Sequence, residues 1–213
     1  MEKRDNNSGR IKPNLDLEIY HSQNYNIIAG VDEVGRGPWA GPVYSAAVIL
    51  NQDNIPDGIN DSKKISPRKR KEIFNKITSN HMFGVGVASV EEIDKINILE
   101  ATFLSMIRAI NNLEITPDFV LVDGNLAPKI DIKTKSIVKG DSKSLSIASA
   151  SIVAKVLRDE YMEEIDLEFP SFNWKKNKGY GTKEHLNALE NHGPTKYHRK
   201  SFSPVRKMLS LRS

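Results

Sequence analysis

Residues 26–34 read NIIAGVDEV, a run of apolar and β-branched residues that ends just before Gly35. A short apolar run bounded by glycine is typical of a strand buried in a sheet. Two acids, Asp32 and Glu33, stand near the end of this run, where removing a carboxylate from water costs free energy. The segment therefore predicts a buried strand of a sheet. It also predicts that two acids lie at the edge of the core, near the end of this strand.

Four further runs are predicted to be strands. Residues 44–50 and 82–89 come next, and strands that follow one another closely favour an antiparallel meander. Residues 118–123, DFVLVD, and 135–139, KSIVK, come later and alternate with helical segments. Strands followed by helices that alternate with strands predict an α/β fold with a mixed sheet.

The predicted helices carry recognisable N-terminal signals. Ser66 stands before Pro67, as an N-cap followed by proline at the first helical position, and Ser89 with Glu92 is a capping box. Later apolar residues recur at spacings of three or four, and one long segment has a face of small residues around Ala148 that allows close packing. The predicted helices are residues 68–79, two helices that meet near Asn97, residues 144–161 and residues 183–191.

The composition excludes several kinds of protein. Hydrophobic residues make up 38% and charged residues 27% of the 213, a balance typical of globular proteins. With no cysteine, the chain has no disulfide, thiolate zinc site or cysteine nucleophile. No apolar run approaches the length of a membrane span, and residues 1–14 lack the apolar stretch of a secretory signal. We therefore expect a cytoplasmic protein that makes no membrane contact.

Positive charge is concentrated in two places. The net charge is only +4, but residues 171–213 hold ten Lys and Arg against two Glu, and residues 63–71 hold a second basic cluster. Basic stretches of this kind suit a phosphate backbone. On charge alone, a solvated basic surface is the simpler interpretation.

Four acids interrupt or follow predicted strands. Asp32 and Glu33 end the first strand, Asp123 follows four apolar residues, and Asp141 follows a strand and a glycine. Buried carboxylates repel one another unless a cation is present. The pattern therefore predicts a site for hard divalent ions such as Mg²⁺, which prefer oxygen ligands. Two such ions about 3.5–4 Å apart can activate a water and stabilise the leaving oxygen of a phosphodiester.

Each acid also has a simpler interpretation. Asp123 precedes a glycine, as in a turn, and Asp141 could cap a helix; the Asp32-Glu33 pair resists this explanation best. Neighbouring strand residues point to opposite faces, so Asp32 and Glu33 cannot both face one ion on a regular strand. Either the strand bends before Gly35, or Glu33 contributes its backbone carbonyl. Our hypothesis makes Asp32 the central bridging ligand and Glu33 the less regular one.

Five ordered blocks of sequence resemble the signature blocks of ribonuclease HII. A single block would mean little, but five in this order are highly specific. The sister family, ribonuclease HIII, typically has Glu as fourth acid and a longer N-terminal domain, so Asp141 and the short N-terminal segment favour HII. Trp39 departs from the pattern, because a smaller aliphatic residue is expected there beside the substrate loop. The blocks are residues 30–43, 61–64, 123–124, 139–159 and 178–199.

The resemblance implies a ribonuclease H-like fold, in which a five-stranded mixed sheet is flanked by helices and followed by a C-terminal helical extension. The chain would then divide into a polar, loosely ordered N-terminal arm (1–25), a catalytic domain (26–168) and a substrate-binding extension (169–213). The resemblance also implies an endoribonuclease for RNA–DNA hybrids that uses two Mg²⁺ or Mn²⁺ ions and leaves 3′-hydroxyl and 5′-phosphate ends. The implied metal ligands and catalytic residues are Asp32, Glu33, Asp123 and Asp141.

Substrate contacts are implied in the same way. From the residues alone, Gly35-Arg36-Gly37 is a turn and Tyr180 is a packing residue between glycines. In the family the equivalent glycine–arginine–glycine contacts the 2′-hydroxyl, the group that distinguishes RNA from DNA. The residue matching Tyr180 packs on the next sugar, which would allow cutting on the 5′ side of one ribonucleotide in duplex DNA. Candidate phosphate contacts are Lys63, Lys64 and Lys143.

Two other functions remain open from the sequence. A recombinase-type or structure-specific nuclease of the same fold would share the acids but not the pair formed by residues 35–37 and Tyr180. A non-catalytic nucleic-acid-binding module would need the basic patches but not four acids. His185 and His198 could act as general bases, but metal ions already supply an activated water, so we expect a helix residue and a packed or surface residue. Nothing requires an oligomer, and we expect a monomer.

Overall fold

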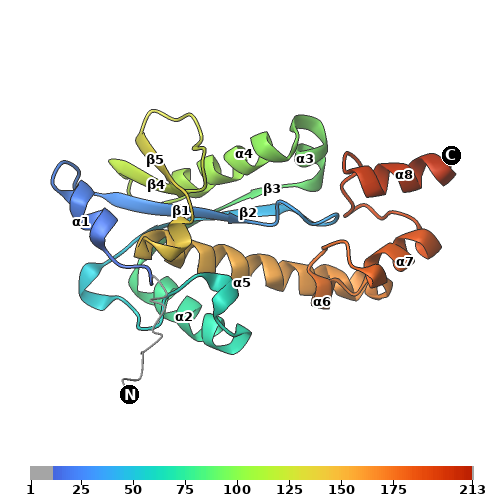
Figure 1. The fold of residues 1–213 in the computed structure, drawn as a ribbon, viewed down its shortest axis with the longest axis horizontal. Coiled ribbons are helices and arrows are strands. Elements are labelled where there is room, and N and C mark those ends of the chain that lie inside the picture. The colour runs from blue at the N-terminus through green and yellow to red at the C-terminus, as the bar shows by residue number, and fades with distance from the viewer. Residues whose placement is uncertain (1–11, 213) are drawn as a thin grey trace, which may run out of the picture.

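Five strands form one mixed sheet at the centre of the protein (Figure 1). They are β1 (Ile28–Val34), β2 (Val43–Ile49), β3 (Met82–Ala88), β4 (Phe119–Asp123) and β5 (Lys133–Ile137). The strand order is β3-β2-β1-β4-β5 in the computed structural model, which describes residues 12–212. β1, β2 and β3 pair antiparallel, as the predicted meander requires, whereas β4 runs parallel to β1 and β5 parallel to β4. The predicted mixed sheet is confirmed.

Helices cover both faces of this sheet. The α-helices of the described residues are α1 (Asp16–Ser22), α2 (Pro67–Asn80), α3 (Val90–Ile96), α4 (Ile98–Asn111), α5 (Leu145–Glu168), α6 (Trp174–Asn177), α7 (Lys183–His192) and α8 (Ser203–Arg212). Short 3-10 helices are η1 (Gln52–Asn54), η2 (Ser62–Lys64), η3 (Gly140–Ser142) and η4 (Pro170–Phe172). α4 and α3 lie on one face, and α5 and α2 lie on the other (Figure 1). None of the helices in residues 12–212 has the length and apolar character that crossing a membrane would need.

The central strand and the longest helix approach each other closely. A Cβ at Gly30 would lie 2.2 Å from the backbone carbonyl carbon of Ser146, so only glycine allows α5 to lie this near β1. The predicted small residues Ala148 and Ala154 of this helix are both fully buried, in a core cluster that also contains Ala46 of β2. This close packing fixes the position of α5 relative to the acid-bearing end of β1.

The N-terminal helix signals are confirmed. The Ser66 side chain accepts a hydrogen bond from the Lys69 amide at the start of α2, and Ser89 forms both bonds of a capping box with Glu92. The predicted break at Asn97 separates α3 from α4; Asn97 has φ 72° and its side chain caps α4. These caps satisfy amides that the helix itself leaves unpaired.

Most element boundaries differ from the prediction by one or two residues, and the larger differences are in β5, α5 and the C-terminus. β5 begins at residue 133 and ends at 137, because Lys139 adopts a left-handed conformation (φ 57°) that turns the chain into η3. α5 continues seven residues past 161, because Met162 and Ile165 extend its buried face. The C-terminus adds α8, which was not located beforehand, although a helical extension was expected.

The N-terminal arm differs more. Residues 1–11 of the expected arm, 1–25, lie outside the described residues. Residues 16–22 form α1, so the prediction of a loosely ordered segment was wrong there. The buried carboxylate of Glu18 accepts hydrogen bonds from the hydroxyls of Ser144 and Ser146 and from the Ser146 amide, and thereby ties α1 to the start of α5. This contact is not evident in the sequence, because the buried residue is Glu18, and an acid in a polar segment is usually expected to be exposed.

The C-terminal segment packs at one end of the sheet (Figure 1). Its small core surrounds the fully buried Trp174 and includes Phe172, Leu189 and Val205, with Met162 contributed by the end of α5. Residues 39–41 pair with 197–199 through an isolated antiparallel bridge between Ala40 and His198. The extension therefore contacts the loop that follows β1, which is next to the cavity described below.

Candidate active site

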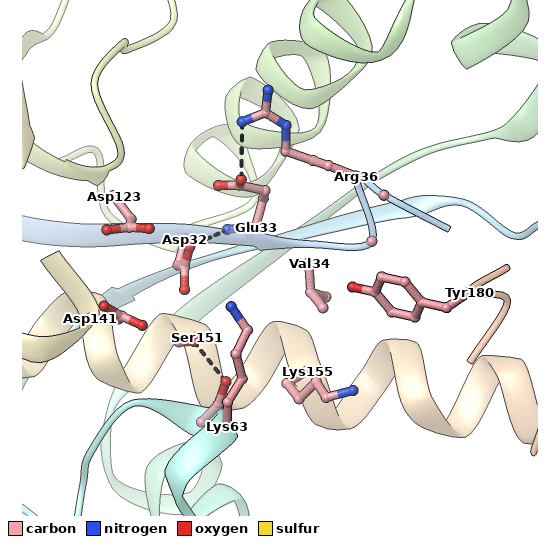
Figure 2. A pocket seen from close by; sticks show the side chains of 13 residues that line it. Asp32, Glu33, Val34, Arg36, Lys63, Asp123, Asp141, Ser151, Lys155 and Tyr180 are labelled. Atoms are coloured by element: carbon pink, nitrogen blue, oxygen red, sulfur yellow. Dashed lines mark hydrogen bonds and ion pairs between the residues drawn. The ribbon is translucent and has the colours of Figure 1, made fainter. Parts of the chain in front are cut away.

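A cavity of about 390 Å³ opens at the C-terminal ends of β1 and β4 (Figure 2). Parallel pairing places Val31 opposite Val122, so Asp32 and Asp123 arrive side by side at this edge. Asp141 comes from η3, whose Gly140 amide donates a 2.6 Å hydrogen bond to Asp123 Oδ1. The cavity is lined by Asp32, Glu33, Val34, Gly35, Arg36, Gly37, Ser62, Lys63, Asp123, Asp141, Ser151, Lys155 and Tyr180. The four predicted acids therefore meet in one place.

Asp32 and Glu33 lie on opposite faces of β1. The register of β1 with β2 continues without a bulge through Val34, so the strand does not bend at the acids. Asp32 is 5% exposed and points toward α5, whereas the Glu33 carboxylate lies on the α4 side with Arg36 Nη1 at 3.5 Å (Figure 2). The Glu33 amide donates a 2.7 Å hydrogen bond to Asp32 Oδ1. Of the two geometric solutions, the bent strand is excluded.

The acids destabilise one another's charged forms. Burial raises the pKa of Asp32 well above its usual value, and the charges of Glu33 and Asp123 raise it further. Burial also raises the pKa of Glu33, although Arg36 opposes the shift. Burial raises the pKa of Asp141 as well, with added repulsion from the neighbouring acids Asp61 and Asp123. A cation among these carboxylates would relieve both the repulsion and the loss of hydration.

The donor set fits a hard divalent cation. All the charged donors are carboxylate oxygens, which suit Mg²⁺ and Mn²⁺ better than softer metals. Among the side chains of residues 12–212, no three acids or histidines already form a compact cage for an ion. The acids instead stand around a shared space, which suits ions that keep several waters and also bind substrate phosphate.

The predicted ribose-reading residues lie in the same cavity. Gly35, Arg36 and Gly37 form the wall after β1, and the Tyr180 ring faces them (Figure 2). A Cβ on Gly37 would lie 3.4 Å from Tyr180 Cε1, so the glycine leaves a narrow space beside the ring. Tyr180 is 46% exposed. It is therefore available to a ligand, and the interpretation of Tyr180 as a packing residue is wrong.

The model of the family described as Ribonuclease HII matches residues 29–205. The chain belongs to the ribonuclease HII family. Ribonuclease HII of Wolbachia pipientis subsp. Culex pipiens (strain wPip) is 62% identical, over 84% of this chain and 92% of its own length. Ribonuclease HII of Vibrio parahaemolyticus is 50% identical, over 90% of this chain and 91% of its own length. Ribonuclease H2 from Pyrococcus horikoshii OT3 superposes with a TM-score of 0.72 at 26% identity, covering 87% of this chain and 98% of that one.

These relatives confirm the ribonuclease H-like fold and the class of enzyme. Ribonucleases HII are metal-dependent endonucleases that cleave RNA in RNA–DNA hybrids, and this chain is such a hydrolase. The cavity at the ends of β1 and β4 holds the acids that this chemistry requires. The roles of individual residues are taken up as proposals below.

The cavity is also lined by side chains that were not among the predicted site residues. Ser62 and Ser151 share a 2.9 Å hydrogen bond on the cavity wall, and Ser151 also bonds Asp32. Lys155 stands one helical turn after Ser151 and pairs with Asp159 at 2.6 Å. The spacing of four from Ser151 to Lys155 on a helix with a small-residue face could have indicated both residues.

The three lysines that were predicted to contact phosphate lie in different positions relative to the cavity. Lys63 lines the main cavity and extends into it (Figure 2). Lys64 pairs with Asp61 at 3.2 Å and lines an adjoining cavity of about 380 Å³ that also contains Asp141. Lys143 is exposed and lines neither cavity. The structure thus brings Lys63 and Lys64 to the acids but leaves Lys143 outside.

His185 and His198 are packed away from the acids. Both are fully buried, and their Nε2 atoms lie 3.0 Å apart. The Thr195 amide donates to His198 Nδ1, and His185 Nδ1 lies 2.9 Å from the Tyr180 carbonyl oxygen. One assignment of protons satisfies the whole chain: His198 Nε2 donates to His185, and His185 Nδ1 donates to Tyr180. The expectation that neither is a general base is consistent with this position.

Proposed function

We propose that the protein, beyond cleaving RNA in hybrids, cuts duplex DNA on the 5′ side of a single embedded ribonucleotide. One observation carries the proposal: the acids, the Gly35–Gly37 loop and the Tyr180 ring share one cavity. Cleavage and sugar recognition would then occur at adjacent nucleotides. The product would carry a 3′-hydroxyl on one side and a 5′-phosphate on the other.

Asp32, Asp123 and Asp141 through their carboxylates, together with Glu33, would hold two Mg²⁺ or Mn²⁺ ions. Asp32 is the proposed bridging ligand, because it is buried between Glu33 and Asp123 and repelled by both. Glu33 would contribute its backbone carbonyl, since its side chain lies on the other face of β1. Bound divalent ions supply an activated water and stabilise charge on the leaving oxygen. In the balanced reaction, water adds to phosphorus, the bond to the 3′ oxygen breaks, and that oxygen takes up a proton.

Sugar recognition would come from the loop and the tyrosine. Backbone groups of Gly35–Gly37 can approach a ribose closely, because Gly37 presents no side chain. Arg36 would hold the adjacent phosphate. The exposed Tyr180 ring would pack on the next sugar, where a 2′-hydroxyl would crowd it and a deoxyribose would not. This arrangement supports a preference for an RNA-to-DNA junction.

The remaining proposals concern phosphate contacts, the C-terminal extension, oligomeric state and cellular location. Lys63, Lys64 and Lys143 would add phosphate contacts, and residues 169–213 would form the substrate-binding extension that carries Tyr180. We propose that the protein acts as a monomer in the cytoplasm on hybrids and ribonucleotide-containing DNA, in ribonucleotide excision linked to DNA replication. The absence of cysteine fits a reducing compartment.

The test uses a labelled DNA duplex with one ribonucleotide, beside an all-DNA duplex and an RNA–DNA hybrid. Each is incubated with protein and Mg²⁺, Mn²⁺ or EDTA, and the ends are mapped. We expect metal-dependent cutting on the 5′ side of the lone ribonucleotide and no cutting of all-DNA. Cutting of the hybrid alone would remove the junction proposal, and cutting of all-DNA junctions would favour a structure-specific nuclease.

A further inference from the structure

Two arginines are completely buried beneath the substrate loop. Arg158 of α5 and Arg199 of the C-terminal segment are both 0% exposed. No ion pair formed by residues 12–212 includes either one. Burial lowers the pKa of Arg158 to about 10 and that of Arg199 to about 9, so both remain charged at pH 7. A buried cation without a counterion is costly, so its hydrogen bonds must offset that cost.

Arg199 directs all its side-chain hydrogen bonds to one loop. Nη2 donates to the Gly35 carbonyl at 2.5 Å and Nη1 to the Arg36 carbonyl at 2.9 Å. Nε and Nη2 donate to the Gly41 carbonyl at 2.9 and 2.7 Å. The Arg199 amide also donates to the Trp39 carbonyl, which fixes the arginine's own backbone against the loop. Charged donors form stronger hydrogen bonds than neutral ones, so the carbonyls are held firmly.

The direction of these carbonyls determines the direction of two amides. In a trans peptide the N–H points opposite to the C=O, and no described peptide is cis. Because the Gly35 and Arg36 carbonyls point to Arg199, the amides of Arg36 and Gly37 point away from it. Within residues 12–212 neither amide donates to another residue. Both residues line the cavity, so two amides without an acceptor among the described residues belong to its wall.

We propose that Arg199 is a positioning residue for ribose recognition, which holds the Arg36 and Gly37 amides in the orientation that meets the 2′-hydroxyl. The proposal rests on the proposed function, because it assigns the means by which the loop reads the sugar. It also gives the C-terminal segment a second role beyond Tyr180. Arg199 itself is fully buried and does not line the cavity.

Arg158 provides a matched comparison. It has the same burial and also donates to backbone carbonyls, namely those of Ala40, Pro42 and Lys178. None of these carbonyls belongs to the two peptides that carry the Arg36 and Gly37 amides. Arg158 should therefore stabilise the region without setting the direction of those amides.

The experiment measures ribose preference without cleavage. In an Asp32→Asn background with Mg²⁺, Kd is measured for a duplex with one ribonucleotide and for the same duplex in all-DNA form. Arg199→Lys, which keeps the charge but replaces the planar guanidinium with a single ammonium that lacks its fixed hydrogen-bond geometry, should reduce the ratio of the two Kd values by about tenfold. Its affinity for all-DNA should change by less than about twofold, because phosphate contacts are intact. Arg158→Lys should lower the melting temperature and keep the ratio.

The outcomes separate this inference from the proposed function. If the Asp32→Asn parent shows no ribose preference, the ribose-reading role of the loop fails, and this inference fails with it. If the parent prefers ribose and folded Arg199→Lys keeps the full preference, only the role of Arg199 is overturned. A proportional loss of affinity for both duplexes in Arg199→Lys also overturns it, because that pattern indicates general damage. Circular dichroism and thermal melting confirm folding of each variant.

Discussion

The carboxylates and the Gly35–Gly37 loop line one cavity but are held in place by different means. Asp32 and Asp123 occupy the ends of regular parallel strands, and their positions follow from sheet register. The loop has no regular structure and is held by the buried guanidinium of Arg199. This residue follows the loop by 158 to 164 positions in the sequence. The acids destabilise the folded state through repulsion, whereas the loop depends on hydrogen bonds from the buried guanidinium of Arg199, which forms no ion pair among residues 12–212. Chemistry and recognition can therefore be disrupted separately.

The largest effect should come from removing the charge at the centre of the acids. Asp32→Asn should lower kcat on the order of 10³-fold or more, because it removes the proposed bridging ligand. The same change relieves repulsion of Glu33 and Asp123, so the melting temperature in EDTA should rise. Steady-state cleavage and thermal melting measure the two effects. A variant with near-normal kcat, or one destabilised in EDTA, would contradict this account of Asp32.

A substitution at Gly37 in the loop should lower activity on a ribonucleotide substrate and leave stability nearly unchanged. Gly37→Ala should leave stability nearly unchanged, because its φ is not positive and its Cβ would meet only Tyr180 at 3.4 Å. That methyl would enter the space proposed for the sugar, so cleavage of a single-ribonucleotide duplex should fall roughly 10²-fold. Gly35→Ala is the contrast: φ is +98° and the Cβ would lie 2.2 Å from Arg158 Nε, so stability should fall. Equal activity of Gly37→Ala and wild type would remove the loop from the sugar site.

The histidine pair predicts a pH dependence of stability in the C-terminal segment. Burial, with the neighbouring His185, lowers the pKa of His198 to about 3, against about 6.5 in an unfolded chain. The unfolded state binds more protons between these values, so this stability is complete above pH 6.5 and declines as pH falls toward 3. At about 1.4 kcal/mol per pH unit, wild type should lose about 2 kcal/mol more than His198→Gln between pH 7.5 and 5.0.

Urea unfolding at the two pH values measures this difference. His192→Gln is the control, because His192 is exposed on α7 and outside the buried pair. Parallel losses in wild type and His198→Gln would show that the pair does not titrate in this way.

The smallest effects should come from the lysines. Lys63→Gln should flatten the plot of log binding constant against log salt by about 0.9, the value for one lost phosphate contact. Lys64→Gln should flatten it less, since Lys64 is partly neutralised by Asp61. Lys143→Gln tests whether an exposed lysine outside both cavities still contacts the backbone, and exposed Lys76 on α2 serves as the control. An unchanged slope for Lys63→Gln would exclude it from the phosphate path.

Much of the framework could be predicted from the sequence, because local signals determine it. The apolar run before Asp32, the capping box at Ser89 and the break at Asn97 each act over a few residues. The grouping of the acids also follows from strand ends, once β1 and β4 are known to be parallel. Whether the strand bends to bring Glu33 beside Asp32 was left open by the sequence, and the regular register of β1 decides against the bend.

The remainder depends on contacts between distant residues. Nothing near Glu18 indicates that its carboxylate caps α5, and nothing near Arg199 indicates that its guanidinium holds the Gly35 carbonyl. A basic, polar C-terminal sequence is also typical of a solvated surface. The sequence therefore locates the chemistry but not the buried polar contacts that hold the recognition loop.

The most direct test of this separation compares Asp32→Asn and Gly37→Ala on one labelled duplex with a single ribonucleotide, measuring both binding preference over all-DNA and cleavage in Mg²⁺. We predict that Asp32→Asn binds the ribonucleotide preferentially but does not cut, whereas Gly37→Ala loses the preference while Mg²⁺ still raises its melting temperature as in wild type. The contrary result would be that Asp32→Asn loses the ribose preference together with cleavage, or that Gly37→Ala keeps the ribose preference. In either case catalysis by the acids and ribose recognition by the loop are not separable, and the account is wrong.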